Sequence, residues 1–218
     1  RPPRGKARAR STGGGNAPGA DVRAAAARAV HAVRVEGRSL TGALAAGGAA
    51  VPLRDQPLLQ ELCYGTLRLL PRLEALIAIL LSRPLRRADR ILNALMAVGL
   101  YQLVSTRIPA HAAVAATVDA TRALERPRAA GLVNAALRRF QREREALLGR
   151  VGSDPADPAL FPDWLVARLQ GAWPDHWQRI IAASNERAPM APPALPGPEE
   201  TKDTHTSSHA PAATTGGE

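Results

Sequence analysis

Apolar side chains recur at intervals of three and four residues along most of this chain, which is the spacing of one face of an α-helix. The pattern is clearest on either side of Pro109, in the stretch VGLYQLVSTRIPAHAAVAATVDATR, residues 98–122. Proline disfavours helical backbone at the residue before it and suits the first turn of a helix after it. The stretch therefore predicts a buried helix, a tight corner at Ile108 and a second helix through Val114 and Val118.

The same periodicity predicts further helices before and after this corner. We expect helices from Asp21, as N-cap, to a stop at Gly37; over Ser39–Ala46; over about 55–69 and 71–82, meeting at Pro71; over Ala129–Leu148; and two short ones started by Pro162 and Pro174. No run of β-branched residues predicts a strand. The predicted fold class is therefore all-α.

The helical spacing also assigns inward and outward faces. In the first helix Arg23 and Arg28 lie off the apolar face. In the helix over Ala129–Leu148, we expect Leu132, Val133, Ala136, Leu137 and Phe140 to point inward, and Arg138, Arg139, Arg142 and Arg144 largely outward. Such a basic face is either solvated or a contact for a polyanion.

Two segments show no periodicity that could support a core. Residues 1–20, RPPRGKARARSTGGGNAPGA, predict a disordered basic arm, and residues 191–218 predict a disordered tail. Between them we expect a helical domain over 21–150 and a helical linker over 151–190. The arm is either a contact for phosphates or a solvated tail.

Charge sharpens the picture, because it is unevenly placed. Residues 1–150 hold 25 Lys+Arg against 10 Asp+Glu, whereas residues 151–218 hold 4 against 9. Nearly all the cations are arginines, which suit bidentate contacts with phosphates. A nucleic-acid partner is the first interpretation; the alternative is that genomic base composition raises arginine everywhere.

The residues that would carry catalysis or hold a cofactor are missing from the sequence. A single cysteine, Cys63, lies among leucines and predicts a packed thiol, and the histidines are too scattered to predict a metal site. Glycine-rich nucleotide-binding motifs are absent, and Trp164, Trp173 and Trp177 are expected to pin the last two helices together rather than to stack on bases. No apolar run approaches the length of a membrane span, and no secretory signal is recognisable, so we expect a cytoplasmic protein.

Several long motifs in the same order resemble one family. The strings LLQELCYGTLR, GLYQLVSTRIPAHAAVAATVDATRA, GLVNAALRRFQRERE and FPDWLVARLQGAWPDHW, over roughly residues 21–190, resemble the N-terminal RNA-binding domain of the Sun/Fmu 16S rRNA cytosine-5 methyltransferases. That resemblance implies a NusB-like helical bundle. It also implies a partner, small-subunit ribosomal RNA, and a full-length enzyme that transfers a methyl group from S-adenosylmethionine to C5 of a cytosine.

The cofactor loop and the catalytic cysteines of that family have no counterpart here, so we expect no cofactor, metal or catalytic residue in this chain. After SNERAPM the sequence departs from the family pattern, which predicts a truncation or a shifted reading frame. The alternative is a free-standing NusB-like antitermination or adaptor protein that binds RNA. The RNA-binding residues that the resemblance and the charge together predict are Arg4, Lys6, Arg8, Arg10, Arg23 and Arg28, with Arg138 and Arg139 as weaker candidates.

Overall fold

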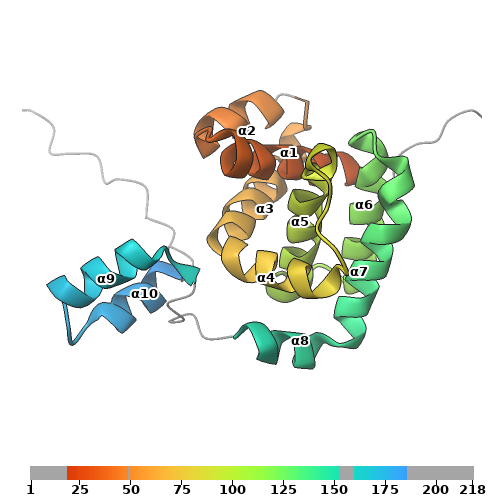
Figure 1. Ribbon diagram of the computed structural model, residues 1–218. Coiled ribbons are helices and arrows are strands. Elements are labelled where there is room, and N and C mark those ends of the chain that lie inside the picture. The colour runs from red at the N-terminus through yellow and green to blue at the C-terminus, as the bar shows by residue number, and fades with distance from the viewer. Residues whose placement is uncertain (1–18, 49, 153–159, 186–218) are drawn as a thin grey trace, which may run out of the picture. The chain divides into compact units, whose positions relative to one another are not determined.

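The computed structural model describes residues 19–48, 50–152 and 160–185. The described residues form ten α-helices and no strand, which confirms the all-α prediction (Figure 1). The helices are α1 (Ala20–Glu36), α2 (Leu40–Gly48), α3 (Gln56–Arg68), α4 (Leu70–Leu80), α5 (Ile91–Ser105), α6 (Ala110–Ala123), α7 (Ala130–Arg142), α8 (Arg144–Val151), α9 (Asp163–Ala172) and α10 (Trp177–Asn185). The predicted arm and tail lie outside the described residues, apart from Gly19 and Ala20.

Helix α5 lies at the centre of the bundle formed by α1 to α8 (Figure 1). Eleven of its fifteen residues are buried, because α1, α3, α4, α6 and α7 all pack against it. A helix that is apolar on every side is the kind that a core surrounds completely. The buried helix predicted before the corner at Ile108 is confirmed.

The corner between α5 and α6 is built as the sequence predicts. The hydroxyl of Thr106 donates to the carbonyl of Gln102 at 2.8 Å and accepts the backbone N–H of Ile108 at 3.3 Å. Pro109 then takes the N-cap position of α6. The side chain of Thr106 thus serves backbone groups on both sides of the turn, which keeps the corner short.

The first helices differ only slightly from prediction. Helix α1 begins at Ala20 rather than after an N-cap at Asp21, because Gly19 takes a left-handed conformation with φ 85° just before it. The predicted stop at Gly37 is confirmed, with φ 69°. The hydroxyl of Ser39 accepts the N–H of Gly42 at 3.2 Å, as a cap should.

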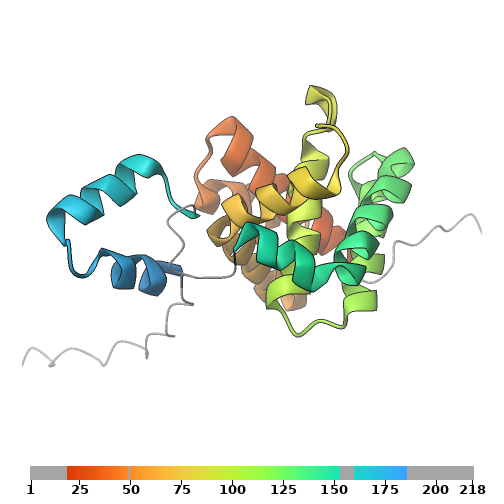
Figure 2. The ribbon, with the colours of Figure 1, turned by 60° about the horizontal axis from the view of Figure 1, so that its bottom comes forward.

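The single helix predicted over Ala129–Leu148 is wrong. It breaks at Glu143 into α7 and α8, and α8 lies beside α4 (Figure 2). After the break, the guanidinium of Arg144 donates to the carbonyls of Leu103 and Val104, which are orphaned at the end of α5. The turned α8 also buries Leu147, which is 2% exposed.

The inward face predicted for this region is confirmed for Val133, Ala136, Leu137 and Phe140, which are all buried on α7. It is wrong for Leu132, which is 40% exposed. The packed thiol predicted at Cys63 is confirmed, since the residue is fully buried on α3. The kink at Pro71 is also confirmed, because α3 ends and α4 begins around Leu69.

Helices α9 and α10 pack against each other, and Val166 and Ile181 are the residues that are buried on them. The tryptophans do not pin this pair as predicted. Trp164 is 68% exposed and Trp173 is 53% exposed, although Trp177 is partly covered. The aliphatic Val166 and Ile181 are therefore buried, whereas the indoles of Trp164 and Trp173 are largely exposed.

Candidate nucleic-acid interface

Arg23 is predicted from the sequence to face outward and bind RNA, but the outward placement is wrong. The residue is 6% exposed; its Nε donates to Oε1 of Gln102 at 3.0 Å and its Nη1 donates to the carbonyl of Gly19 at 3.2 Å. Burial lowers the pKa of Arg23, and the charge of Asp55 acts in the opposite direction. This guanidinium is therefore engaged inside the fold.

The partners of Arg23 form a polar network that sequence reasoning missed. The Nε2 of Gln102 donates to the carbonyl of Val98 at 3.0 Å and to the hydroxyl of Thr117 at 3.3 Å. The hydroxyl of Thr117 in turn donates to the carbonyl of Ala113 at 2.7 Å. These hydrogen bonds join α1, α5 and α6, and they satisfy polar groups that would otherwise be costly to bury. The only sequence signal is a glutamine in the middle of an apolar stretch.

The other predicted arginines that the structure describes lie on α1 and α7. Arg28 is exposed and donates to the carbonyl of Ala123, and Arg138 is exposed and donates to Oε1 of Gln141 at 3.3 Å. Arg139 is half-buried; it pairs with Glu143 at 3.1 Å and donates to the carbonyl of Ile79 at 3.2 Å. Arg4, Lys6, Arg8 and Arg10 lie outside the described residues.

The segment joining α4 to α5, residues 81–90, carries a denser group of arginines. Arg83, Arg86, Arg87 and Arg90 are all exposed, and no side-chain hydrogen bond or ion pair to another described residue engages them. The one acid of the segment, Asp89, pairs with Arg126 at 3.4 Å. The segment therefore presents free guanidinium groups to solvent. Its sequence signal is four arginines within residues 83–90, none of which was predicted from the sequence as a site.

Four depressions surround this segment, with volumes of about 310, 470, 540 and 660 Å³. Neighbouring depressions share lining residues: the first and second share Arg90, the second and third share Arg83, and the third and fourth share Arg86. We call the whole lining the 81–90 surface. Its charged members are Arg34, Arg83, Arg86, Arg90, Arg126, Arg128 and Arg139, with Glu74, Asp89 and Glu125.

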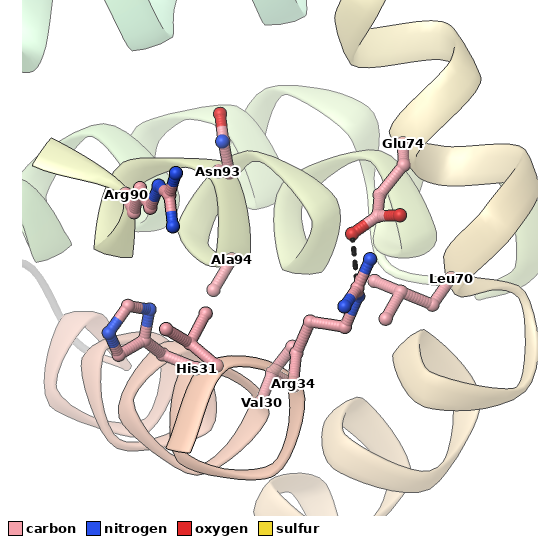
Figure 3. Close-up of a pocket in the computed structure, with 9 residues that line it drawn as sticks. Val30, His31, Arg34, Leu70, Glu74, Arg90, Asn93 and Ala94 are labelled. Carbon is pink, nitrogen blue, oxygen red and sulfur yellow. Dashed lines mark hydrogen bonds and ion pairs between the residues drawn. The ribbon is translucent and has the colours of Figure 1, made fainter. Parts of the chain in front are cut away.

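The smallest of these depressions lies between α1, α4 and α5 (Figure 3). Its wall is formed by His31 and Arg34 of α1, Glu74 of α4, and Arg90 and Asn93 at the start of α5. An ion pair of 3.1 Å joins the guanidinium of Arg34 to the carboxylate of Glu74. The Nδ1 atom of His31 and the Oδ1 atom of Asn93 are buried without a hydrogen-bond partner among the described residues.

The described residues offer little support for a metal site, a nucleophilic cysteine or a membrane-spanning helix. No group of three or more His, Cys, Asp or Glu side chains among them could hold a metal ion. Burial raises the pKa of the Cys63 thiol to about 12, so it is a poor nucleophile. No helix in the described ranges is long and apolar enough to cross a membrane.

Comparison with protein families matches residues 20–142, which cover α1 to α7 with their central α5, to the NusB family. The chain belongs to this family. Residues 161–191 of this NusB-family chain also match a second family model, described as a methyltransferase RsmF/B-like, ferredoxin-like domain. The segment predicted from sequence as a linker, residues 151–190, thus contains all but the last residue of a match to a separate domain model.

Curated relatives of this NusB-family chain carry the name ribosomal RNA small subunit methyltransferase B. The protein from Vibrio vulnificus is 48% identical over 170 residues, which is 78% of this chain and 40% of the relative. Those from Erwinia tasmaniensis and Yersinia enterocolitica are 46% and 45% identical over the same length, 39% of each relative. The chain therefore spans about 40% of the length of the curated relatives it matches.

Proposed function

We propose that this chain is the RNA-binding domain of an enzyme that methylates small-subunit ribosomal RNA at C5 of a cytosine. The observation that carries the proposal is the identity of 45% to 48% over 170 residues with proteins named ribosomal RNA small subunit methyltransferase B, beside the NusB-family match over residues 20–142. An RNA of the ribosome as partner also implies the cytoplasm as location.

In this proposal the chain binds RNA, while methyl transfer from S-adenosylmethionine belongs to a part of the enzyme that these residues do not supply. The first contacts are Arg4, Lys6, Arg8 and Arg10, which precede α1, together with the exposed Arg28. Arg138 is a secondary candidate, because it too is exposed. Arg23 and Arg139 are left out, because Arg23 is buried against Gln102 and Arg139 is half-buried and paired with Glu143.

The test is the binding of transcribed 16S ribosomal RNA to the full chain over a range of salt concentrations. Phosphate contacts release counterions, so we expect the logarithm of affinity to fall linearly with the logarithm of salt concentration. Deleting residues 1–18, which leaves Gly19 as the acceptor for Arg23, should lower that slope by about 0.7 for each single-strand phosphate that the deleted residues neutralise.

Two results would contradict this proposal. One is the absence of RNA binding by the full chain at low salt. The other is a deletion variant whose affinity and salt slope equal those of the full chain, which would remove the N-terminal residues from the interface. A variant with Arg38, Arg107 and Arg150 changed to glutamine is the charge control, since these exposed arginines have no side-chain partner among the described residues.

A second candidate is a free-standing NusB-like antitermination or adaptor protein that binds RNA. The NusB-family match favours both candidates equally, whereas the match of residues 161–191 to a methyltransferase-associated domain favours the first. Gel-shift competition separates them, because an adaptor should prefer an antitermination RNA over 16S ribosomal RNA. The first candidate requires the reverse order.

A further inference from the structure

We propose that the 81–90 surface binds a single-stranded stretch of the RNA, with Arg83, Arg86, Arg90 and Arg128 contacting successive phosphates. This inference rests on the proposed function only in requiring that the chain binds RNA. It places a second contact on the folded bundle, in addition to the N-terminal residues. The position on the bundle follows from the depressions and their free guanidinium groups.

Charge is the first argument. Seven arginines and three acids line the surface, and two of the acids are already paired, Glu74 with Arg34 and Asp89 with Arg126. The four arginines that would contact RNA are exposed and have no side-chain partner among the described residues. Like charges gathered in this way repel one another in the free protein, and a polyanion would relieve that repulsion.

The contrast with other arginines of the bundle is the second argument. Arg23, Arg139 and Arg144 each donate to backbone carbonyls, so the fold itself accounts for them. Arg83 and Arg86 lie in an exposed connection where they serve no such purpose. Guanidinium groups that the fold does not use are available for bidentate contacts with phosphate oxygens, and Arg83 and Arg86, unlike the exposed arginines of the control, also line depressions.

The shape of the surface favours a single strand over a duplex. The depressions have apolar walls, formed around the segment by Leu81, Pro84, Leu85 and the exposed Leu132, with arginines beside them. Unstacked bases can lie against apolar walls or on guanidinium planes while their phosphates face the cations. In an A-form duplex the bases are stacked inside the helix, so these hollows would stay empty.

The continuity of the depressions supports an extended ligand. Each depression shares at least one arginine with the next. Free guanidinium groups therefore line a continuous series of depressions, which begins at the pocket in Figure 3 and ends at the turn at Pro127–Ala129. A mononucleotide would occupy one depression only. A strand of several nucleotides can use all four, which is the arrangement expected of a tract that follows the backbone.

The experiment compares two variants of the full chain with equal loss of charge. The first changes Arg83, Arg86, Arg90 and Arg128 to glutamine. The control changes Arg38, Arg107, Arg142 and Arg150 to glutamine, four exposed arginines that line none of the four depressions. Binding is measured against an RNA of about 20 nucleotides, single-stranded or annealed to its complement, by fluorescence anisotropy over a salt series. Circular dichroism checks that both variants keep the helical content and melting temperature of the unmodified chain.

We expect the first variant to bind the single strand at least about tenfold more weakly, with a salt slope lower by about 3, because each of four neutralised phosphates adds about 0.7 to the slope. The control should show less than about a third of that effect on either measure. Equal effects in the two variants would overturn the inference, and so would a stronger effect on duplex than on single-stranded RNA. Failure of the unmodified chain to bind RNA at all would instead overturn the proposed function.

Discussion

At the scale of single residues, Arg23 is the most consequential side chain of the bundle. Its charge is buried, and its guanidinium donates hydrogen bonds to Gln102 and to the carbonyl of Gly19. We predict that Arg23→Ala destabilises the fold by about 2 to 4 kcal/mol, because it leaves buried acceptors without their donor. Urea unfolding followed by circular dichroism measures the difference.

The matched control for this prediction is Arg38→Ala. Arg38 is exposed just after α1, and its loss should change the free energy of unfolding by less than about 0.5 kcal/mol. If Arg23→Ala were as mild as Arg38→Ala, the buried network would contribute nothing to stability. The assignment of Arg23 to the core rather than to RNA contact would then lose its energetic support.

Cys63 gives the molecule a specific dependence on pH. Burial raises the pKa of its thiol from 9.0 to about 12, so the folded state keeps a proton that the unfolded state loses above about pH 9. Stability from this group is therefore complete below about pH 9 and is lost as the pH rises towards about 12, by up to about 1.4 kcal/mol per pH unit.

The measurement compares unfolding of the unmodified chain and of Cys63→Ala at about pH 8 and about pH 10. We expect the unmodified chain to lose about 1 kcal/mol more than the variant between the two conditions, since only it carries the thiol. Equal losses of stability would mean that the thiol titrates alike in the folded and unfolded states, against its burial on α3.

At the scale of elements, the contact between α3 and α5 depends on a glycine. A Cβ atom added to Gly65 would lie 1.9 Å from the ring of Tyr101, whose hydroxyl donates to Glu61 at 2.6 Å. We predict that Gly65→Ala destabilises the fold by about 1 to 3 kcal/mol, because the buried ring must leave its position. Gly131→Ala on α7 meets nothing within 4 Å and should be neutral or stabilise by up to about 1 kcal/mol. Thermal melts measure both effects. A lower melting temperature for Gly65→Ala and an unchanged or higher one for Gly131→Ala would support the close approach of α3 and α5.

The sequence predicted the helices well and their outer faces less well. Periodicity located α5, the corner at Pro109 and the burial of Phe140, because these depend on local spacing. It misplaced Arg23, because α1 is rich in alanine and is approached by α2, α3, α5 and α6. It also missed the break at Glu143, since Leu147 stays in helical register with Phe140 and only the open end of α5 favours the turn.

At the scale of the whole molecule, the predicted interface and the observed surface overlap little. Sequence reasoning placed RNA contacts on the basic arm, on α1 and on α7. The 81–90 surface instead combines a connecting segment with the turn at Pro127–Ala129, nearly forty residues later. Residues so far apart come together only through the packing of α5 against α7, which no local pattern reveals.

The last prediction concerns the chain as a competitor. If the proposed function holds, an excess of the chain should inhibit the full-length Vibrio vulnificus relative acting on transcribed 16S ribosomal RNA. Transfer of radiolabelled methyl groups measures the effect. Half-inhibition should fall near the dissociation constant of the chain for that RNA, because both proteins compete for one site.

The glutamine variant of Arg83, Arg86, Arg90 and Arg128 should inhibit at least about tenfold less well. Extra S-adenosylmethionine should not relieve the inhibition, since the competition is for RNA; relief by the cofactor, or full activity while the RNA is saturated with the chain, would contradict a shared binding site.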